Sequence, residues 1–131
     1  MRARVLVVED LRIWRNNMKR ALKKTYDVDT AATYEAARQQ LRDNAPYQVV
    51  VTDLGLSEDA NNTDGIKLLQ YLKTTAPTTT TIAVSGRPAF VNESNFIREY
   101  GALVFLERGK FTMDEFVTWV DKGVQLSQLA E

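Results

Sequence analysis

Three carboxylates directly follow two short apolar runs of the sequence, and their type and spacing suit metal-dependent chemistry. Glu9 and Asp10 come after the run 5–8, and Asp53 comes after the run 49–52. Four consecutive aliphatic or β-branched residues are typical of a strand buried on both faces, as in a parallel sheet. Ligands of open parallel sheets bind beyond the carboxyl ends of the strands. If the two strands are neighbours, the three acids therefore converge on one pocket.

A pocket of three carboxylates favours a bound divalent cation, because like charges at close range repel one another. All of the candidate ligand atoms are oxygens, which suit Mg²⁺ or Mn²⁺ better than Zn²⁺. The competing interpretation is that Glu9 and Asp10 are solvated residues at the end of a strand. Two adjacent acids alone favour that interpretation, whereas the addition of Asp53, Ser85 and the order of the elements favours a site.

Composition and charge exclude several classes of protein. The chain has 131 residues, which indicates one domain with one core. Its 17 basic and 17 acidic residues give no general attraction to nucleic acid or to an acidic membrane. The chain has no cysteine, and therefore no disulfide and no thiol chemistry. It also has no histidine that could act as a base or bind a metal ion. The first apolar run is too short for a signal peptide or a membrane span, so we expect a cytoplasmic location.

Predicted strands and helices alternate along the whole chain. The hydrophobic pattern predicts strands over 5–8, 26–31, 49–52, 82–84 and 102–106. It predicts helices from about 11 to 22, 33 to 44, 64 to 76, 92 to 100, and 112 to near the C-terminus. Thr33 and Asp64 are the expected caps of the second and third helices. Thr112 and Glu115 have capping-box spacing, and Phe111 and Phe116 are placed as a hydrophobic staple.

This alternation implies a parallel sheet that is covered by helices on both faces. No internal repeat, low-complexity tract or linker interrupts it, so we expect a single domain over residues 1–131. The end of the last helix is where a longer natural protein would continue into a linker or an output domain.

Several spaced features together resemble the receiver domain of two-component response regulators, over nearly the whole chain. Glu9 and Asp10 resemble the acidic pair of that family, and Asp53 falls at its phosphoacceptor position. Ser85 falls at its switch serine or threonine, and Phe105 at its switch aromatic residue. Further matches are the segments Leu54-Gly55-Leu56, Asp64-Gly65 and Gly101-Ala102. Each feature alone would be weak, but their spacing makes the set specific.

The resemblance implies a flavodoxin-like, doubly wound α/β fold with a five-stranded parallel sheet of order 2-1-3-4-5. It implies that Asp53 accepts a phosphoryl group from a sensor histidine kinase or a phosphotransfer protein. Mg²⁺ would be held by Glu9, Asp10, Asp53 and the backbone carbonyl of Gly55. Such a domain is not an enzyme, since it catalyses only its own phosphorylation and dephosphorylation.

The resemblance also implies a switch. The Ser85 hydroxyl would bind a phosphoryl oxygen, and Phe105 would move inward behind it. The face formed by the fourth helix, the last strand and the last helix would then change. Trp119 and Leu126 lie away from the apolar stripe of the last helix, so they are either part of a partner or homodimer surface or loosely packed residues near the end of the chain.

The chain departs from the family after its last strand. The family places a lysine followed by a proline there, whereas this chain has Arg108 followed by Gly109, with Lys110 two residues beyond Arg108. Either Arg108 takes the place of the lysine, or Lys110 reaches the site. The two are not equivalent, because arginine presents a planar fork and lysine a compact point charge. The loop 54–63 is also about four residues longer than is common in the family.

Other functional classes fit the sequence less well. A haloacid-dehalogenase-type phosphatase needs a second acid at the position of Gly55. A nucleotide-binding loop needs an earlier glycine and a serine or threonine around its Gly-Lys pair, whereas Gly109-Lys110 lacks that glycine and is followed by Phe111. Acids at the strand ends oppose the phosphate of a flavin. The remaining alternative is a degenerate receiver that binds proteins without being phosphorylated, and Arg108 followed by Gly109 keeps it open.

Overall fold

A parallel sheet forms the centre of the molecule. The computed structural model describes residues 2–57, 59, 61–86, 97 and 99–130. Within them the strands are β1 (Arg4–Val8), β2 (Asp27–Ala31), β3 (Val49–Asp53), β4 (Thr80–Ser85) and β5 (Val104–Glu107). The strand order is β2-β1-β3-β4-β5, with every pair parallel, so the order that the resemblance implied is confirmed.

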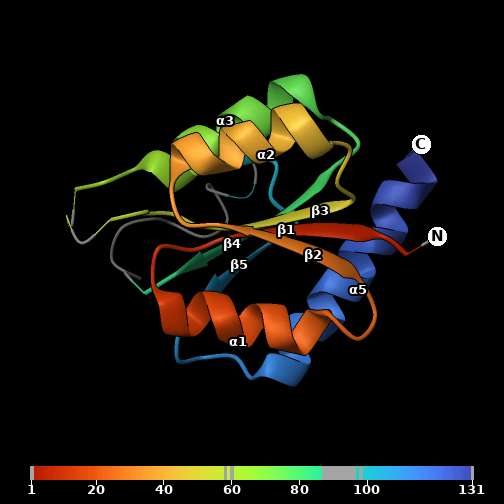
Figure 1. Cartoon of the computed structure of the whole chain (residues 1–131), viewed down its shortest axis with the longest axis horizontal. Coiled ribbons are helices and arrows are strands. Elements are labelled where there is room, and N and C mark those ends of the chain that lie inside the picture. Colours follow the sequence, from red (N-terminus) through yellow and green to blue (C-terminus); the bar gives the residue numbers. More distant parts are fainter. Residues whose placement is uncertain (1, 58, 60, 87–96, 98, 131) are drawn as a thin grey trace.

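Helices cover both faces of the sheet, as predicted. The described helices are α1 (Arg12–Leu22), α2 (Tyr34–Asn44), α3 (Asp64–Thr75) and α5 (Met113–Ala130). Figure 1 shows α2 and α3 on one face and α1 and α5 on the other. The predicted fourth helix, from about 92 to 100, lies mostly outside the described residues. The residues of this range that are described, 97, 99 and 100, are helical. None of the described helices is long and apolar enough to cross a membrane.

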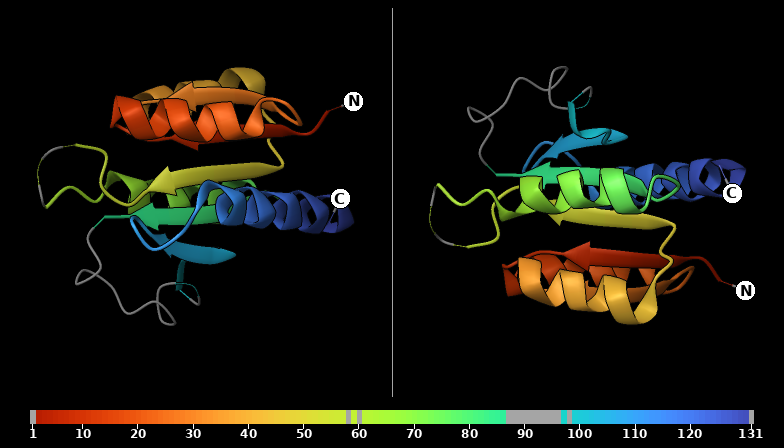
Figure 2. Two further views of the ribbon diagram at one scale, coloured as in Figure 1. Left: turned by 90° about the horizontal axis from the view of Figure 1, so that it is seen from below. Right: turned by 90° about the horizontal axis from the view of Figure 1, so that it is seen from above.

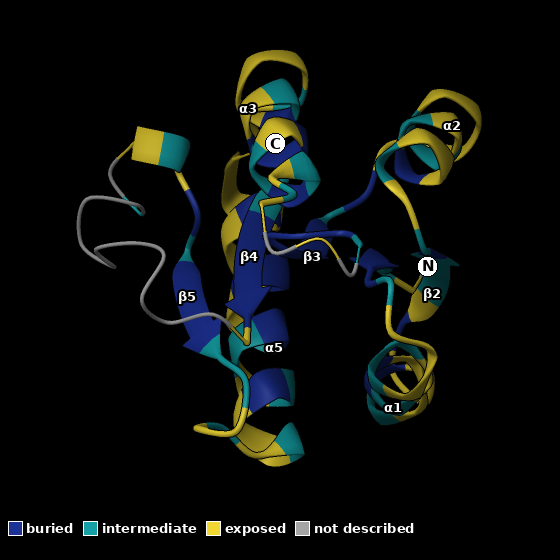
Figure 3. Cartoon of the chain, turned by 90° about the vertical axis from the view of Figure 1, so that its left-hand side faces the viewer, coloured by how far each residue is buried: buried dark blue, intermediate teal, exposed yellow. Residues whose placement is uncertain are grey.

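The two faces of β1 show why its sequence is a continuous apolar run. Val5 and Val7 pack in the core under α1 and α5, while Leu6 and Val8 pack in the core under α2 and α3. All four side chains are completely buried. A strand between two helical layers has no solvent face, so polar and apolar residues do not alternate along it. Figure 3 shows the buried strands between helices whose outer faces are exposed.

Local capping signals explain two of the helix starts, and a third prediction was wrong in detail. The Thr33 side chain accepts a hydrogen bond from the backbone N–H of Ala36 at 3.0 Å, as a helix cap should. The capping box of Thr112 and Glu115 forms in both directions, at 3.0 and 3.1 Å. Asp64 does not cap α3 but begins it, and its N–H donates to the Asn62 side chain at 2.9 Å.

All of the strands point the same way, so their carboxyl ends meet at one edge of the sheet. The views in Figure 2 show the arrowheads of β1, β3 and β4 directed to that edge, with both chain ends at the opposite side. The acids that follow β1 and end β3 therefore lie at the carboxyl edge, far along the molecule from the marked termini.

Candidate functional site

The sheet brings the three predicted acids together at its carboxyl edge. β1 and β3 are neighbours, and Val8 pairs with Thr52 at the ends of their ladder. Glu9, Asp10 and Asp53 each offer a carboxylate oxygen, and these oxygens lie within 4.8 Å of one another. The prediction that the two strands are neighbours is confirmed, and the acids form one cluster.

Gly65 fixes the start of α3 against the end of β3. A Cβ atom on Gly65 would lie 1.7 Å from the backbone carbonyl oxygen of Asp53, which no side chain tolerates. The N–H of Gly65 donates to the Leu54 carbonyl at 3.0 Å. This close approach gives the Asp64-Gly65 pair a physical reason, since it sets the position of the backbone that carries Asp53.

Among the described basic residues, Arg108 is the one whose side chain reaches the acids. Its Nη2 donates to Asp53 Oδ2 at 2.7 Å and also to Glu9 Oε1. The Arg108 backbone N–H donates to the Ser85 carbonyl at 2.8 Å, which places the residue directly beyond the pairing of β4 with β5. The guanidinium carbon lies 5.0 Å from the centre of the Trp14 ring of α1.

Lys110 points elsewhere. Its ammonium group pairs with Glu107 at 2.6 Å, and its side chain is 77% exposed. Of the two basic residues that the sequence left open, the structure brings Arg108 to the carboxylates and leaves Lys110 on the outer side of the loop.

Glu9 is the least accessible member of the cluster. The residue is completely buried, and its Oε2 accepts a hydrogen bond from the Leu11 N–H at 3.3 Å. Burial, followed by the charge of Asp53, raises the pKa of Glu9 to about 8, although Arg108 opposes that rise. A bound cation would lower the pKa of Glu9 again, because positive charge nearby favours the carboxylate form.

Asp53 is mostly buried but borders an open cavity of about 220 Å³. Asp10, Gly55 and Arg108 line the same cavity. The Gly55 N–H donates to Asp53 Oδ1 at 3.3 Å, which leaves the carboxylate held from both sides, by this N–H and by Arg108. A small ligand can therefore reach the carboxylate from the cavity.

The predicted switch residues lie next to this cluster. Ser85 is buried at the end of β4, one residue beyond Val84, which pairs with Asp53. Phe105 of β5 is buried in a small core with Leu54 and Leu69. The predicted surface residues of α5 differ: Leu126 is exposed, whereas Trp119 is half-buried against the core.

Sequence reasoning missed two residues that shape the site. Arg15 donates from Nη1 to the carbonyls of Glu9 and Asp10, at 2.9 and 3.4 Å, and so holds the turn that follows β1. Trp14 lies within the predicted helix 11–22, and its ring contacts the Arg108 guanidinium. No local sequence pattern predicts the contact of Arg15 with this turn or the contact of Trp14 with Arg108.

The residues present fit a divalent cation. The donor set is entirely oxygen, as Mg²⁺ and Mn²⁺ require, and carries more negative charge than Arg108 neutralises. A buried cluster of this kind is stabilised by added positive charge.

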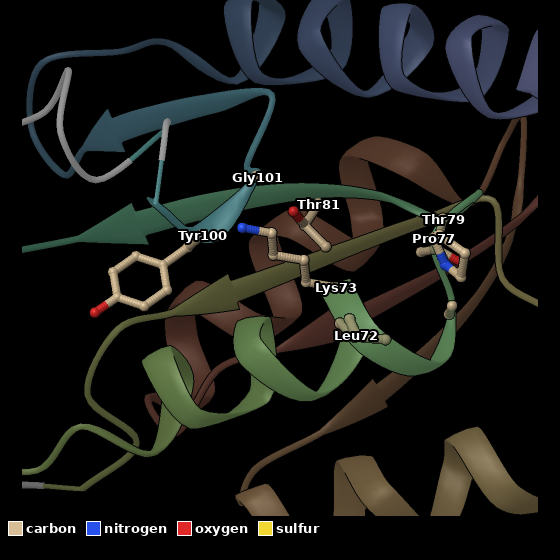
Figure 4. A pocket seen from close by; sticks show the side chains of 8 residues that line it. Leu72, Lys73, Pro77, Thr79, Thr81, Tyr100 and Gly101 are labelled. Atoms are coloured by element: carbon tan, nitrogen blue, oxygen red, sulfur yellow. The ribbon is translucent and has the colours of Figure 1, made fainter.

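A second cavity of similar volume, about 220 Å³, lies away from this cluster. Figure 4 shows it between the end of α3 and the start of β4, where Lys73, Thr81 and Tyr100 line it. The Lys73 ammonium donates to the Glu99 carbonyl at 2.7 Å. None of the clustered acids lines this cavity, so it is separate from the site.

The open parallel fold and the acidic cluster at its carboxyl edge define a class of small α/β domains with an acidic pocket at one edge of the sheet. The family model of the response regulator receiver domain matches residues 5–121. The chain belongs to that family. Receiver domains are signalling domains rather than classical enzymes, and in general they act as phosphorylation-dependent switches.

Solved structures agree on the fold. A CheY-like receiver domain protein from Methanospirillum hungatei is 19% identical, with a TM-score of 0.84 and complete coverage of both chains. A receiver domain protein from Clostridium thermocellum is 21% identical, with a TM-score of 0.81 over 98% of this chain and 99% of that one. NtrX from Brucella abortus is 26% identical, with a TM-score of 0.82 over 99% of this chain but 29% of its own. No curated protein matches the sequence.

Proposed function

We propose that this domain is a signalling switch in which Asp53 accepts a phosphoryl group in the presence of Mg²⁺. The observation that carries the proposal is the Asp53 carboxylate, which borders an open cavity between two acids and one arginine. A carboxylate is a competent nucleophile toward phosphorus. Phosphoryl transfer depends mainly on positioning and charge neutralisation, which this constellation supplies without a histidine.

The donor that we propose is a phosphohistidine of a sensor histidine kinase or a phosphotransfer protein. An Asp53 oxygen forms a bond to phosphorus while the phosphorus–nitrogen bond of the donor breaks, leaving an acyl phosphate and the donor histidine. Glu9, Asp10, Asp53 and the Gly55 carbonyl would hold Mg²⁺, which neutralises charge on the transferred group. Arg108 takes the role of the family's lysine and, with the Ser85 hydroxyl, binds the phosphoryl oxygens.

The output surface that we propose includes β5 and α5 together with the region of the predicted fourth helix. Phosphorylation adds about −1.5 to −2 charges beside Ser85, and Phe105 packs within the same part of the sheet. The exposed Leu126 gives α5 an apolar contact for a partner or a second copy of the domain. Direct nucleic-acid binding by this domain is not expected. A single domain, a cytoplasmic location and a homodimer stay predictions.

One observation favours a second candidate, a degenerate receiver that binds proteins without phosphorylation. Arg108 already bridges Glu9 and Asp53, and the following Gly109 has a φ of +89°, where the family has a proline. Proline cannot adopt that conformation, so this loop follows another path. An arginine that permanently neutralises the acids would block both metal and phosphoryl group.

A phosphate mimic separates the two candidates. The domain is titrated with Mg²⁺ and then with beryllofluoride while tryptophan fluorescence is recorded, with Asp53→Asn as the control. The phosphorylation switch predicts a saturable, Mg²⁺-dependent change that the variant lacks. A folded domain whose fluorescence and backbone NMR spectrum respond to neither ligand would instead be a binding module.

A further inference from the structure

The contact between Arg108 and the acids uses a single nitrogen atom. Nη2 of Arg108 donates to both Glu9 and Asp53, which are two of the three acids that can share a metal ion. Strong arginine–carboxylate pairs normally use two parallel N–H groups, and this one does not. Within the described part of the chain, the buried Nε of Arg108 has no hydrogen-bond partner. The guanidinium of Arg108 therefore lies inside the site, but it contacts the acids through Nη2 and not through Nε.

Trp14 gives the guanidinium a second support that does not depend on Glu9. The ring lies on the α1 side of the site, 5.0 Å from the guanidinium carbon, and packs beside Phe111 at 6.3 Å between ring centres. A cation on an aromatic face keeps part of its stabilisation when it loses a carboxylate partner. Arg108 can thus release Glu9 and stay near Asp53.

The charges make a direct competition unavoidable. Three carboxylates and one guanidinium share a site in which the Arg108 side chain is 16% exposed and Glu9 is completely buried. A divalent cation bound by Glu9 and Asp53 would meet the positive charge of Arg108 at contact distance. Like charges that close repel strongly in a poorly solvated site.

We propose that Arg108 is a built-in competitor of the divalent cation, which must displace its guanidinium from Glu9 in order to bind. Trp14 is the positioning residue that supports Arg108 in both states. This inference rests on the proposed function and adds its regulation. In the metal-free domain Arg108 occupies the acids, so the domain binds Mg²⁺ more weakly than its three acids would allow, and Arg108 gives up Glu9 only when the metal enters.

The test compares cation binding in matched variants, all carrying Trp119→Phe so that Trp14 is the single tryptophan. Mg²⁺ and Mn²⁺ are titrated into the parent, Arg108→Ala, Arg108→Lys and Lys110→Ala, with Trp14 fluorescence and backbone amide shifts as readouts. We expect Arg108→Ala to bind Mg²⁺ about tenfold more tightly than the parent, with Arg108→Lys between them. The Trp14 signal that accompanies binding should appear in the parent and disappear in Arg108→Ala.

Lys110→Ala removes the same charge from the same loop, but that charge pairs with Glu107 in solvent. Equal tightening in this variant would reveal a general charge effect and overturn the inference. Equal or weaker binding in folded Arg108→Ala and Arg108→Lys would overturn it too, while the metal site itself would stand. If no folded variant binds either cation, the inference fails together with the metal part of the proposed function.

Discussion

Each end of the sheet has an arginine beside a carboxylate and an aromatic ring, yet only the group at the carboxyl end is the candidate site. At the amino end, Arg4 pairs with Asp29 at 3.4 Å and lies 4.8 Å from the centre of the Tyr47 ring. At the carboxyl end, Arg108 faces the acidic cluster and the Trp14 ring. The residue types are similar, so the difference lies in charge balance and burial.

The amino-end group is balanced. One arginine faces one aspartate, both about one-third exposed, and the Tyr47 hydroxyl donates to the same aspartate at 2.6 Å. Burial and then this hydrogen bond raise the pKa of Tyr47, so the phenol remains a donor. The charges of Arg4 and Asp29 compensate each other, so this group does not favour the binding of a further ion.

The carboxyl-end group is unbalanced. Within the described residues three acids share one arginine, and the most buried of the acids, Glu9, has a strongly raised pKa. Acidic groups beyond those that the protein itself neutralises favour the binding of a cation, which can in turn neutralise a transferred phosphoryl group. The comparison shows that unmatched charge, more than the presence of charged residues, distinguishes the site from a structural cluster.

The largest expected effect comes from Asp53→Asn. The variant keeps the shape of the side chain but loses the proposed nucleophile and one proposed metal ligand, so labelling by acetyl phosphate should fall to background. Mass spectrometry of the intact domain measures it. The matched amino-end variant is Asp29→Asn, which should still be labelled. Equal loss in both variants would erase the distinction between the two ends.

Gly65→Ala should be the most destabilising of the small changes around the site. The added Cβ would lie 1.7 Å from the Asp53 carbonyl oxygen, so the start of α3 or the end of β3 has to move. We expect a loss of about 3 kcal/mol in the free energy of unfolding, measured with urea. Gly86→Ala is the control, because its Cβ would have ordinary contact with Arg108 at 3.5 Å.

The unbalanced end should also make stability depend on pH. Glu9 has an ordinary pKa of 4.5 and a folded pKa of about 8, so the folded state holds its proton more tightly. This contribution is complete below pH 4.5 and is lost as the pH rises toward 8. In the absence of metal, urea unfolding should show stability falling over that range.

Two variants test the origin of this slope. Glu9→Gln should flatten it, since an amide does not titrate. Asp29→Asn should leave it in place, because the amino-end pair carries no such buried excess of charge. A slope that survives Glu9→Gln would assign the dependence to another group.

The smallest effect is expected from Tyr47→Phe. It removes the hydrogen bond to Asp29 and leaves the ring under Arg4, so the free energy of unfolding should fall by about 1 kcal/mol. Mg²⁺ affinity and the response to beryllofluoride should stay at the parent values. A change in either would couple the two ends of the sheet and weaken the contrast between them.

Local patterns predicted most of the fold. The run 5–8 indicated a strand buried on both faces, and the capping box at Thr112 and Glu115 formed as expected. These signals lie within a few residues of each other, so short-range geometry suffices to interpret them. The cap of α3 was predicted less well, because Asn62 in the loop before it binds the N–H of Asp64.

The sequence by itself determined where the acids lie, because a residue that follows a parallel strand must reach the carboxyl edge of the sheet. The sequence also limited the basic residue that faces these acids to Arg108 or Lys110. Only the tertiary structure shows that Arg108 is the residue that reaches the acids. The backbone conformation at Gly109 sets the path of the loop, and the Trp14 ring of α1 contacts the Arg108 guanidinium. Such contacts join residues about ninety positions apart, and their formation depends on how the whole sheet and its helices pack.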